Sequence, residues 1–163
     1  MSLPSTAIAV AARRLCMADL APFAGLVPLD HGLVVISTSR ADGTVQSSVV
    51  NAGVLDHPLT GRPVVGFVSG GSSRRLVNLR ARPLATVVIR AGWTWAGVEG
   101  PVDLCGPDDP LGGIDGERLR LLLREIFTAA GGTHEDWEEY DRVMAEERRV
   151  AVFVTPERTY GSG

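Results

Sequence analysis

The feature that most constrains this chain is a series of short, β-branched runs separated by turn signals over residues 32–104. The runs 32–39 and 45–55 flank the tripeptide Ala41-Asp42-Gly43, and an Asp-Gly pair supplies the positive φ that a tight hairpin needs. Further strands are predicted at 64–68, 85–89 and 93–104. Five such strands in succession predict a meander that curls into a small antiparallel barrel, so the fold is expected to be mainly β.

Helical signals and one more strand surround this barrel. Three helices are predicted: one from Ser72 or Ser73, as N-cap, to Leu79 before Pro83; one from the cap Asp115 to Gly131-Gly132; and one that begins at Thr133. Residues 149–155 predict a last strand, and residues 5–26 predict one or two short helices. We therefore expect an N-terminal extension over residues 1–18 and one domain over residues 19–161.

Composition excludes several classes of function. The 163 residues suffice for one domain with a core, and a net charge of −3 favours neither nucleic acid nor a membrane as partner. All 16 basic residues are arginines, so the chain has no Schiff-base lysine and no Walker A loop. The two cysteines and three histidines show no metal-ligand spacing, so no metal is expected. No window approaches the ~20 apolar residues of a membrane span, and Arg13-Arg14 lacks the apolar stretch of a signal, which predicts a cytoplasmic protein.

One segment, residues 69–79, combines several anion-binding devices in the sequence SGGSSRRLVNL. Glycines allow a close approach of the backbone, free amides at a helix start carry the positive end of the dipole, and arginine forks match phosphate oxygens. Between His57 and Val98 the chain holds six arginines and no acid. The segment therefore predicts a phosphomonoester site, and a capped surface helix with solvated arginines is the alternative.

Two further sets of residues are candidates. Strand alternation places Ser47, Val49 and Asn51 on one face of the second strand, where Asn51 is either a structural amide or a ligand contact. Trp93 and Trp95 are expected to share one face of a later strand, and such pairs belong to a core, an interface or a ligand site.

Several motifs along the chain, from about Leu20 to Gly161, follow a recognisable order. They are Ala41-Asp42-Gly43, Ser73-Arg74-Arg75, Asn78-Leu79-Arg80 with Pro83, Gly92-Trp93-Thr94-Trp95, Glu99-Gly100, Asp136-Trp137 with Tyr140, Arg148-Arg149-Val150 and Tyr160-Gly161. In this order the chain resembles the flavin/deazaflavin oxidoreductases of the pyridoxamine 5'-phosphate oxidase-like family, and in particular the actinobacterial branch that binds the deazaflavin coenzyme F420. The resemblance implies a six-stranded antiparallel split β-barrel, the FMN-binding split barrel, with peripheral α-helices.

The same resemblance implies roles for individual residues. Arg75 matches the phosphate-binding basic position, Ser73 and Arg74 flank it, and Asn78 holds that loop in place. Ser47, Ser48 and Asn51 match the strand along the isoalloxazine-like ring, and Trp93 and Trp95 match a strand near the ring and the dimer seam. A homodimer with the cofactor between its subunits is implied. Gly53, Val54 and Leu55 are apolar where some relatives place larger polar or aromatic residues, so substrate contacts are not carried over.

The choice of cofactor depends on charge. Pyridoxamine-phosphate oxidase itself is disfavoured because no His here has Arg two residues before it. F420 continues beyond its phosphate into an oligoglutamate tail, for which Arg62, Arg80 and Arg82 are available, and this favours F420 over FMN. The first hypothesis is hydride transfer between reduced F420 and a small organic acceptor such as an enone, a quinone or a tetrapyrrole, with no catalytic side chain assigned. The alternatives are an FMN-binding flavoprotein and an F420 carrier without turnover.

Overall fold

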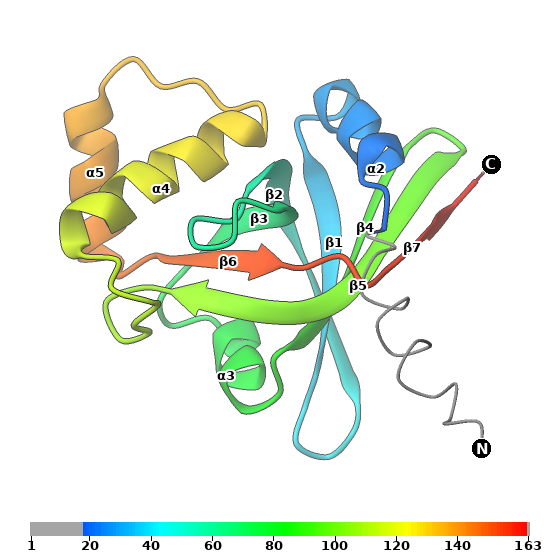
Figure 1. Ribbon diagram of the computed structural model, residues 1–163, viewed down its shortest axis with the longest axis horizontal. Helices are drawn as coiled ribbons and strands as arrows, with labels where there is room; N and C mark the ends of the chain where they lie inside the picture. Colours follow the sequence, from blue (N-terminus) through cyan, green and yellow to red (C-terminus); the bar gives the residue numbers. More distant parts are fainter. Residues whose placement is uncertain (1–17, 163) are drawn as a thin grey trace, which may run out of the picture.

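The computed structural model describes residues 18–162, which form seven strands, four α-helices and one 3-10 turn (Figure 1). In chain order these are α2 (Ala21–Leu26), η1 (Val27–Leu29), β1 (Leu33–Ser39), β2 (Val45–Asp56), β3 (Pro63–Ser69), α3 (Arg74–Ala81), β4 (Leu84–Ala91), β5 (Thr94–Cys105), α4 (Gly116–Ala129), α5 (Trp137–Glu146), β6 (Val150–Val154) and β7 (Arg158–Gly161). All six predicted strands are present. The predicted extension over residues 1–18, with Arg13, Arg14 and Cys16, lies outside the described residues except for its last position.

Six of the strands close into an antiparallel barrel in the order β1-β2-β3-β6-β5-β4, since β4 pairs with both β1 and β5. Two long strands change partners halfway. β2 pairs with β1 over residues 45–51 and with β3 over residues 52–56. β5 pairs with β4 over residues 94–101 and with β6 over residues 102–105. The predicted six-stranded antiparallel split β-barrel with peripheral helices is therefore confirmed.

The partner change divides the barrel into two halves. Half-sheet A contains β1, β4, β7 and the first parts of β2 and β5. Half-sheet B contains β3, β6 and the second parts of β2 and β5. Side chains from α2 and α3 join the core inside the barrel from opposite ends, at the top and bottom of Figure 1. A second core lies between the outer surface of half-sheet B and α4, which α5 flanks.

Three expectations about the elements were wrong. The first five strands do not form a meander, because β3 and β4 do not pair; α3 connects them, and β6 from the end of the chain pairs with β3 instead. The last helix begins at Trp137, not Thr133, because the Asp136 carboxylate accepts the amide of Glu139 at 3.0 Å and so caps it. β7 was missed: all four of its residues are exposed, so it lacks the apolar alternation that marks a strand.

Candidate functional site

The anion-binding segment forms the turn between β3 and α3. The register of β3 with β6 sets Ser69 opposite Val150, so this turn lies against residues 147–149. The amide of Gly71 donates to the carbonyl of Glu147 at 3.3 Å, and a Cβ on Gly71 would lie only 2.4 Å from the carbonyl oxygen of Arg148. A residue without a side chain is required for this contact, which brings the arginines that open α3 close to those that precede β6.

The first turn of α3 has no side-chain cap. Ser73 is the N-cap residue, as predicted, but its hydroxyl lies 2.8 Å from the hydroxyl of Ser69 and does not bond a helix amide. The first amides of α3 therefore keep their capacity to bind another acceptor, and the helix dipole adds partial positive charge there. Both effects favour an anion at this end of the helix.

Arg75 is the half-buried cation of this turn. Burial lowers the pKa of its guanidinium, and the like charge of Arg149 lowers that pKa further. Arg149 is itself paired with Glu147, with Nε 2.6 Å from Oε2, whereas Arg75 forms no ion pair with the described residues. An anion placed between Arg75 and Arg149 would balance the remaining positive charge.

Asn78 connects α3 to the barrel. It is 3% exposed, and its Nδ2 donates to Thr38 Oγ1 and to Gln46 Oε1, both at 3.0 Å. The bonds join α3 to β1 and to the first part of β2, close to where β2 leaves β3. Because its amide is satisfied within the protein, Asn78 holds the turn and α3 in position.

The three polar residues of β2 do not all face the same way. Ser47 and Asn51 lie with Val49 on the outer surface of half-sheet A, as alternation predicted, whereas Ser48 points to the opposite face. The hydroxyl of Ser47 lies 2.8 Å from that of Ser37. Asn51 Nδ2 donates to the carbonyl of His31 at 2.8 Å, so this amide supports the loop before β1.

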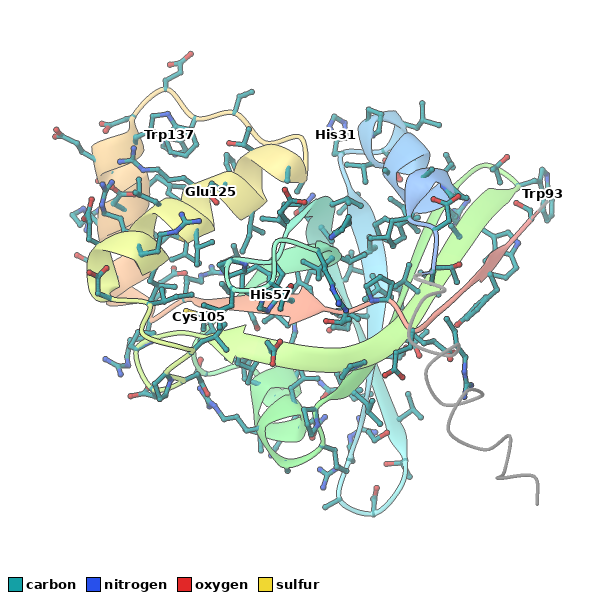
Figure 2. The ribbon with its side chains drawn as sticks, viewed as in Figure 1. His31, His57, Trp93, Cys105, Glu125 and Trp137 are labelled. Atoms are coloured by element: carbon teal, nitrogen blue, oxygen red, sulfur yellow. The ribbon has the colours of Figure 1, made fainter. Side chains whose placement is uncertain are left out.

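The two tryptophans also differ in position. Trp93 precedes β5, lies at the tip of the β4–β5 hairpin and is 97% exposed (Figure 2). Trp95 lies within β5 and packs edge to face on Tyr160 of β7, with the ring centroids 6.0 Å apart. Trp93 lies outside the strand, because the turn after Ala91 extends through it, but both tryptophans line one recess with Val88 and Arg90, so they lie on the same side of the hairpin.

The outer surface of half-sheet A is an exposed apolar face, which we call the open face. Seven large apolar side chains on it are at least 39% exposed: Leu33, Val35, Val45, Val49, Leu84, Trp95 and Tyr160. No helix among residues 18–162 covers this surface in the way that α4 covers half-sheet B. Exposed apolar side chains gathered on one surface of a sheet are typical of a binding surface.

The described histidines include no free acid–base candidate at the turn. His57 is 4% exposed, with Nε2 3.0 Å from Asp103 Oδ2, and its Nδ1 accepts the amides of Leu59 and Thr60 at 3.2 and 3.3 Å. Both ring nitrogens are engaged, so His57 is structural. Residues 18–162 contain no cluster of three or more His, Cys, Asp or Glu side chains that could hold a metal, and none of their helices is long and apolar enough to span a membrane.

Several solved structures share this fold. A conserved hypothetical protein, Rv2991, from Mycobacterium tuberculosis has a TM-score of 0.58 and 16% identity, over 85% of this chain and 82% of that one. A protein named F420 reductase has a TM-score of 0.57 and 17% identity, over 83% and 94%. A pyridoxamine 5'-phosphate oxidase-related, FMN-binding protein from Nostoc punctiforme has a TM-score of 0.59 and 13% identity, over 99% and 86%.

These similarities concern the fold. No family model matches the chain. The three neighbours include an F420 reductase and an FMN-binding protein, so the resemblance seen in the sequence is confirmed at the level of the split barrel.

Sequence reasoning missed Arg149 as a site residue. Arg149 is 74 positions beyond Arg75, and only the pairing of β3 with β6 brings the two arginines together. The available signal was the Arg148-Arg149-Val150 motif just before a predicted strand. This motif identifies a site residue only when the strand order is known, and the predicted meander gave the wrong order. We therefore conclude that the chain has a split β-barrel fold with a basic turn between β3 and α3.

Proposed function

We propose that the protein is an F420-dependent oxidoreductase. The observation that carries the proposal is the pair Arg75 and Arg149 beside an uncapped helix start, which leaves positive charge unbalanced where a phosphate group would bind. The fold is one in which an F420 reductase and an FMN-binding protein have been solved, and this adds support at the level of architecture.

The residues present fit a phosphorylated cofactor. Arg75 and Arg149 would hold the phosphate, Ser73 and Arg74 would flank it, and Asn78 would keep the turn in position through its bonds to β1 and β2. Ser47, Ser48 and Asn51 lie on the strand along which the ring would extend. The bound deazaflavin would supply the hydride chemistry, and the protein would supply binding, orientation and exclusion of water.

We assign no side chain as a proton donor. His57 uses both ring nitrogens within the protein, and Tyr160 donates its hydroxyl to Glu99 at 2.8 Å. In the proposed reaction a small organic acceptor, such as an enone, a quinone or a tetrapyrrole, receives the hydride, and solvent protonates the product.

We further propose that the protein is a cytoplasmic homodimer that pairs through the open face. Apolar side chains from five strands are exposed there, and Trp95 packs against Tyr160 at one side of the same surface. Trp93, at the hairpin tip, would then reach the partner subunit near its cofactor. A face of this kind in an isolated subunit is expected to associate with a second copy or another protein.

The test is a pair of titrations of purified protein, one with F420 and one with FMN, followed by tryptophan fluorescence. Micromolar binding of F420 with much weaker FMN supports the proposal, and the opposite order favours the FMN-binding flavoprotein. Reduced F420 is then incubated anaerobically with menadione and with cyclohexenone, and its absorbance is followed. Tight binding without oxidation of reduced F420 by any acceptor in a broad panel would favour the cofactor carrier. Binding of neither cofactor would refute all three functions.

A further inference from the structure

The loop between β5 and α4, residues 106–115, carries two consecutive acids that each pair with an arginine. Asp109 accepts both Nε and Nη2 of Arg80, at 2.8 and 2.7 Å, so this pair is bidentate. Asp108 accepts Nη2 of Arg148 at 2.6 Å. One short loop, which lies near the start of β6 at the left of Figure 1, therefore contacts two arginines that are far apart in the chain.

These two arginines belong to the two parts of the basic turn. Arg80 lies in the last turn of α3, and Arg75 lies in its first turn. Arg148 directly precedes Arg149. A hydrogen bond from Arg148 lowers the pKa of Asp108, and the charges of Arg148 and Arg80 lower that pKa further. The loop therefore connects the helix that carries Arg75 to the segment that carries Arg149.

The loop is built to hold its two acids in fixed positions. The amides of Gly106 and Asp109 each donate to the other residue's carbonyl, at 3.0 and 3.1 Å. Pro107 and Pro110 flank the acids and restrict the backbone there. The side chain of Asp109 is 11% exposed and that of Asp108 is 63% exposed, so the Asp109 pair is the stronger contact.

The segment held by Asp108 contains a strained residue. Arg148 has a φ of +49°, in the left-handed region that favours glycine. Its amide donates to the carbonyl of Ala145 at 3.1 Å, and the amide of Arg149 donates to the carbonyl of Met144 at 2.9 Å, so this turn ends α5. The turn sets the direction in which the chain enters β6, and with it the position of Arg149.

The two parts of the basic turn also repel each other. Burial lowers the pKa of Arg75, and the like charge of Arg149 lowers it further, so the two guanidinium groups interact. The direct bond between the two parts, from the amide of Gly71 to the carbonyl of Glu147, is long at 3.3 Å. Repulsion favours separation of the two arginines until an anion binds. A loop that ties both parts opposes this movement, and a site that is already assembled binds its ligand more tightly.

We propose that the β5–α4 loop is a clip that sets the separation of Arg75 and Arg149, with Asp108 and Asp109 as positioning residues for a bound phosphate group. The inference rests on the proposed function, although FMN would present a phosphate group to the same two arginines as F420. The clip has an effect opposite to that of charge alone. Two acids near an anion site weaken anion binding through their field, so their removal would tighten binding if they had no positioning role.

The test uses variants that separate position from charge. D108N/D109N removes both carboxylates with little change in shape, and D109N alone is the milder form of the same change. R80D/D109R exchanges the charges of the bidentate pair and keeps the net charge of the wild type. D56N is the control, because Asp56 is an exposed acid that forms no ion pair within residues 18–162. Thermal unfolding establishes that each variant is folded, and each is titrated with F420, FMN and inorganic phosphate.

We expect D108N/D109N to bind the cofactor about five- to tenfold more weakly than the wild type, because the arginines must then be ordered on binding. D109N should show most of this loss. R80D/D109R and D56N should stay within about twofold of the wild type. When R149Q is already present, adding D108N/D109N should change the Kd by less than about twofold, because the arginine that the clip positions is gone.

A second measurement reads the clip without any ligand. Amide hydrogen exchange of the free protein should be faster in D108N/D109N than in the wild type at residues 70–76 and 147–149, and unchanged in β1. R80D/D109R should restore slower exchange at residues 70–76. These amides report whether the loop ties the two parts of the basic turn together.

The outcomes separate this inference from the proposed function. Equal or tighter cofactor binding by D108N/D109N, with unchanged exchange, refutes the clip and leaves F420 binding intact. Faster exchange in a protein that binds neither cofactor retains the clip and refutes the proposed function. Weaker binding that R80D/D109R shares with D109N also overturns the inference, because Asp109 would then act by another route than its pair with Arg80.

Discussion

Replacing Arg75 by glutamine separates a binding role from a structural one. A structural arginine stabilises the free protein, and its loss lowers the unfolding temperature. Arg75 instead lies half-buried beside Arg149, with burial and like charge both acting against its charged form. We therefore predict that the free R75Q protein is as stable as the wild type or slightly more stable, although it binds the cofactor more weakly.

The magnitudes follow from the two effects. Relief of one partly exposed like-charge contact is worth about 0.5 kcal/mol, offset by lost packing of the arginine stem, so Tm should stay within ~2 °C of the wild type or rise. Loss of charge-assisted bonds to a phosphate costs about 1.5–3 kcal/mol, or roughly 10- to 150-fold in Kd. At a cofactor concentration 100 times the wild-type Kd, ligand stabilisation should fall from about 2.7 kcal/mol to roughly 0.3–1.4 kcal/mol.

The assay is thermal unfolding with and without F420, combined with the fluorescence titration. R62Q is the matched control, because Arg62 is exposed in the β2–β3 turn and forms no ion pair within the described part of the chain. It should match the wild type in both measurements. A free R75Q protein that unfolds many degrees lower than the wild type would make Arg75 structural. An undiminished shift with F420 would place the phosphate elsewhere.

Three other predictions address the fold and the assembly. A Cβ on Gly53 would lie 2.2 Å from backbone atoms of α4, so G53A should cost at least ~1–3 kcal/mol in unfolding free energy, whereas G116A, with open space around it, should be neutral or stabilising by up to ~1 kcal/mol; urea denaturation measures both. Burial raises the pKa of Tyr140 to about 12, above its unfolded value near 10, so its protonated form contributes stability that is complete below pH 10 and lost as pH rises through 12. This loss amounts to up to ~2.7 kcal/mol in the free energy of unfolding. It should be absent in Y140F when unfolding is compared at pH 9 and pH 12. V49D, on the open face, should convert a dimer into a folded monomer by light scattering, and a wild type that is already monomeric would contradict the proposed assembly.

Much of the fold was predictable because its local signals agree with its tertiary structure. The expected hairpin forms at residues 41–43, α4 begins after the cap Asp115, and each β-branched run forms a strand. The strand order was not predictable in the same way. β6 pairs with β3 although some 80 residues of chain separate them, and no local pattern in the two strands specifies that partner. β7 is exposed at every position and has no alternation to detect.

The candidate site was predicted only as far as it is local. Residues 69–75 form one turn, and their composition alone indicated an anion. Arg149 reaches this region through the pairing of β3 with β6, so sequence spacing could not identify it. For Asn51 the sequence left a structural amide and a ligand contact open; its Nδ2 donates to the carbonyl of His31, and the ligand contact stays a prediction.

The position of the site follows from how the barrel is closed. A strand that changes partners leaves part of one edge without a neighbouring strand, and within residues 18–162 this applies to positions 45–51 of β2 on the side away from β1. Backbone groups on such an edge need another partner. Asn78 on α3 bonds the Gln46 side chain beside this edge. The basic first turn of α3 therefore lies next to backbone that has no neighbouring strand. A ligand with an anionic end and a flat polar ring can bind the basic turn with its anionic end and the unpaired backbone of β2 with its ring. The partner change that allows six strands to close therefore also creates the place where, under the proposed function, such a ligand would bind.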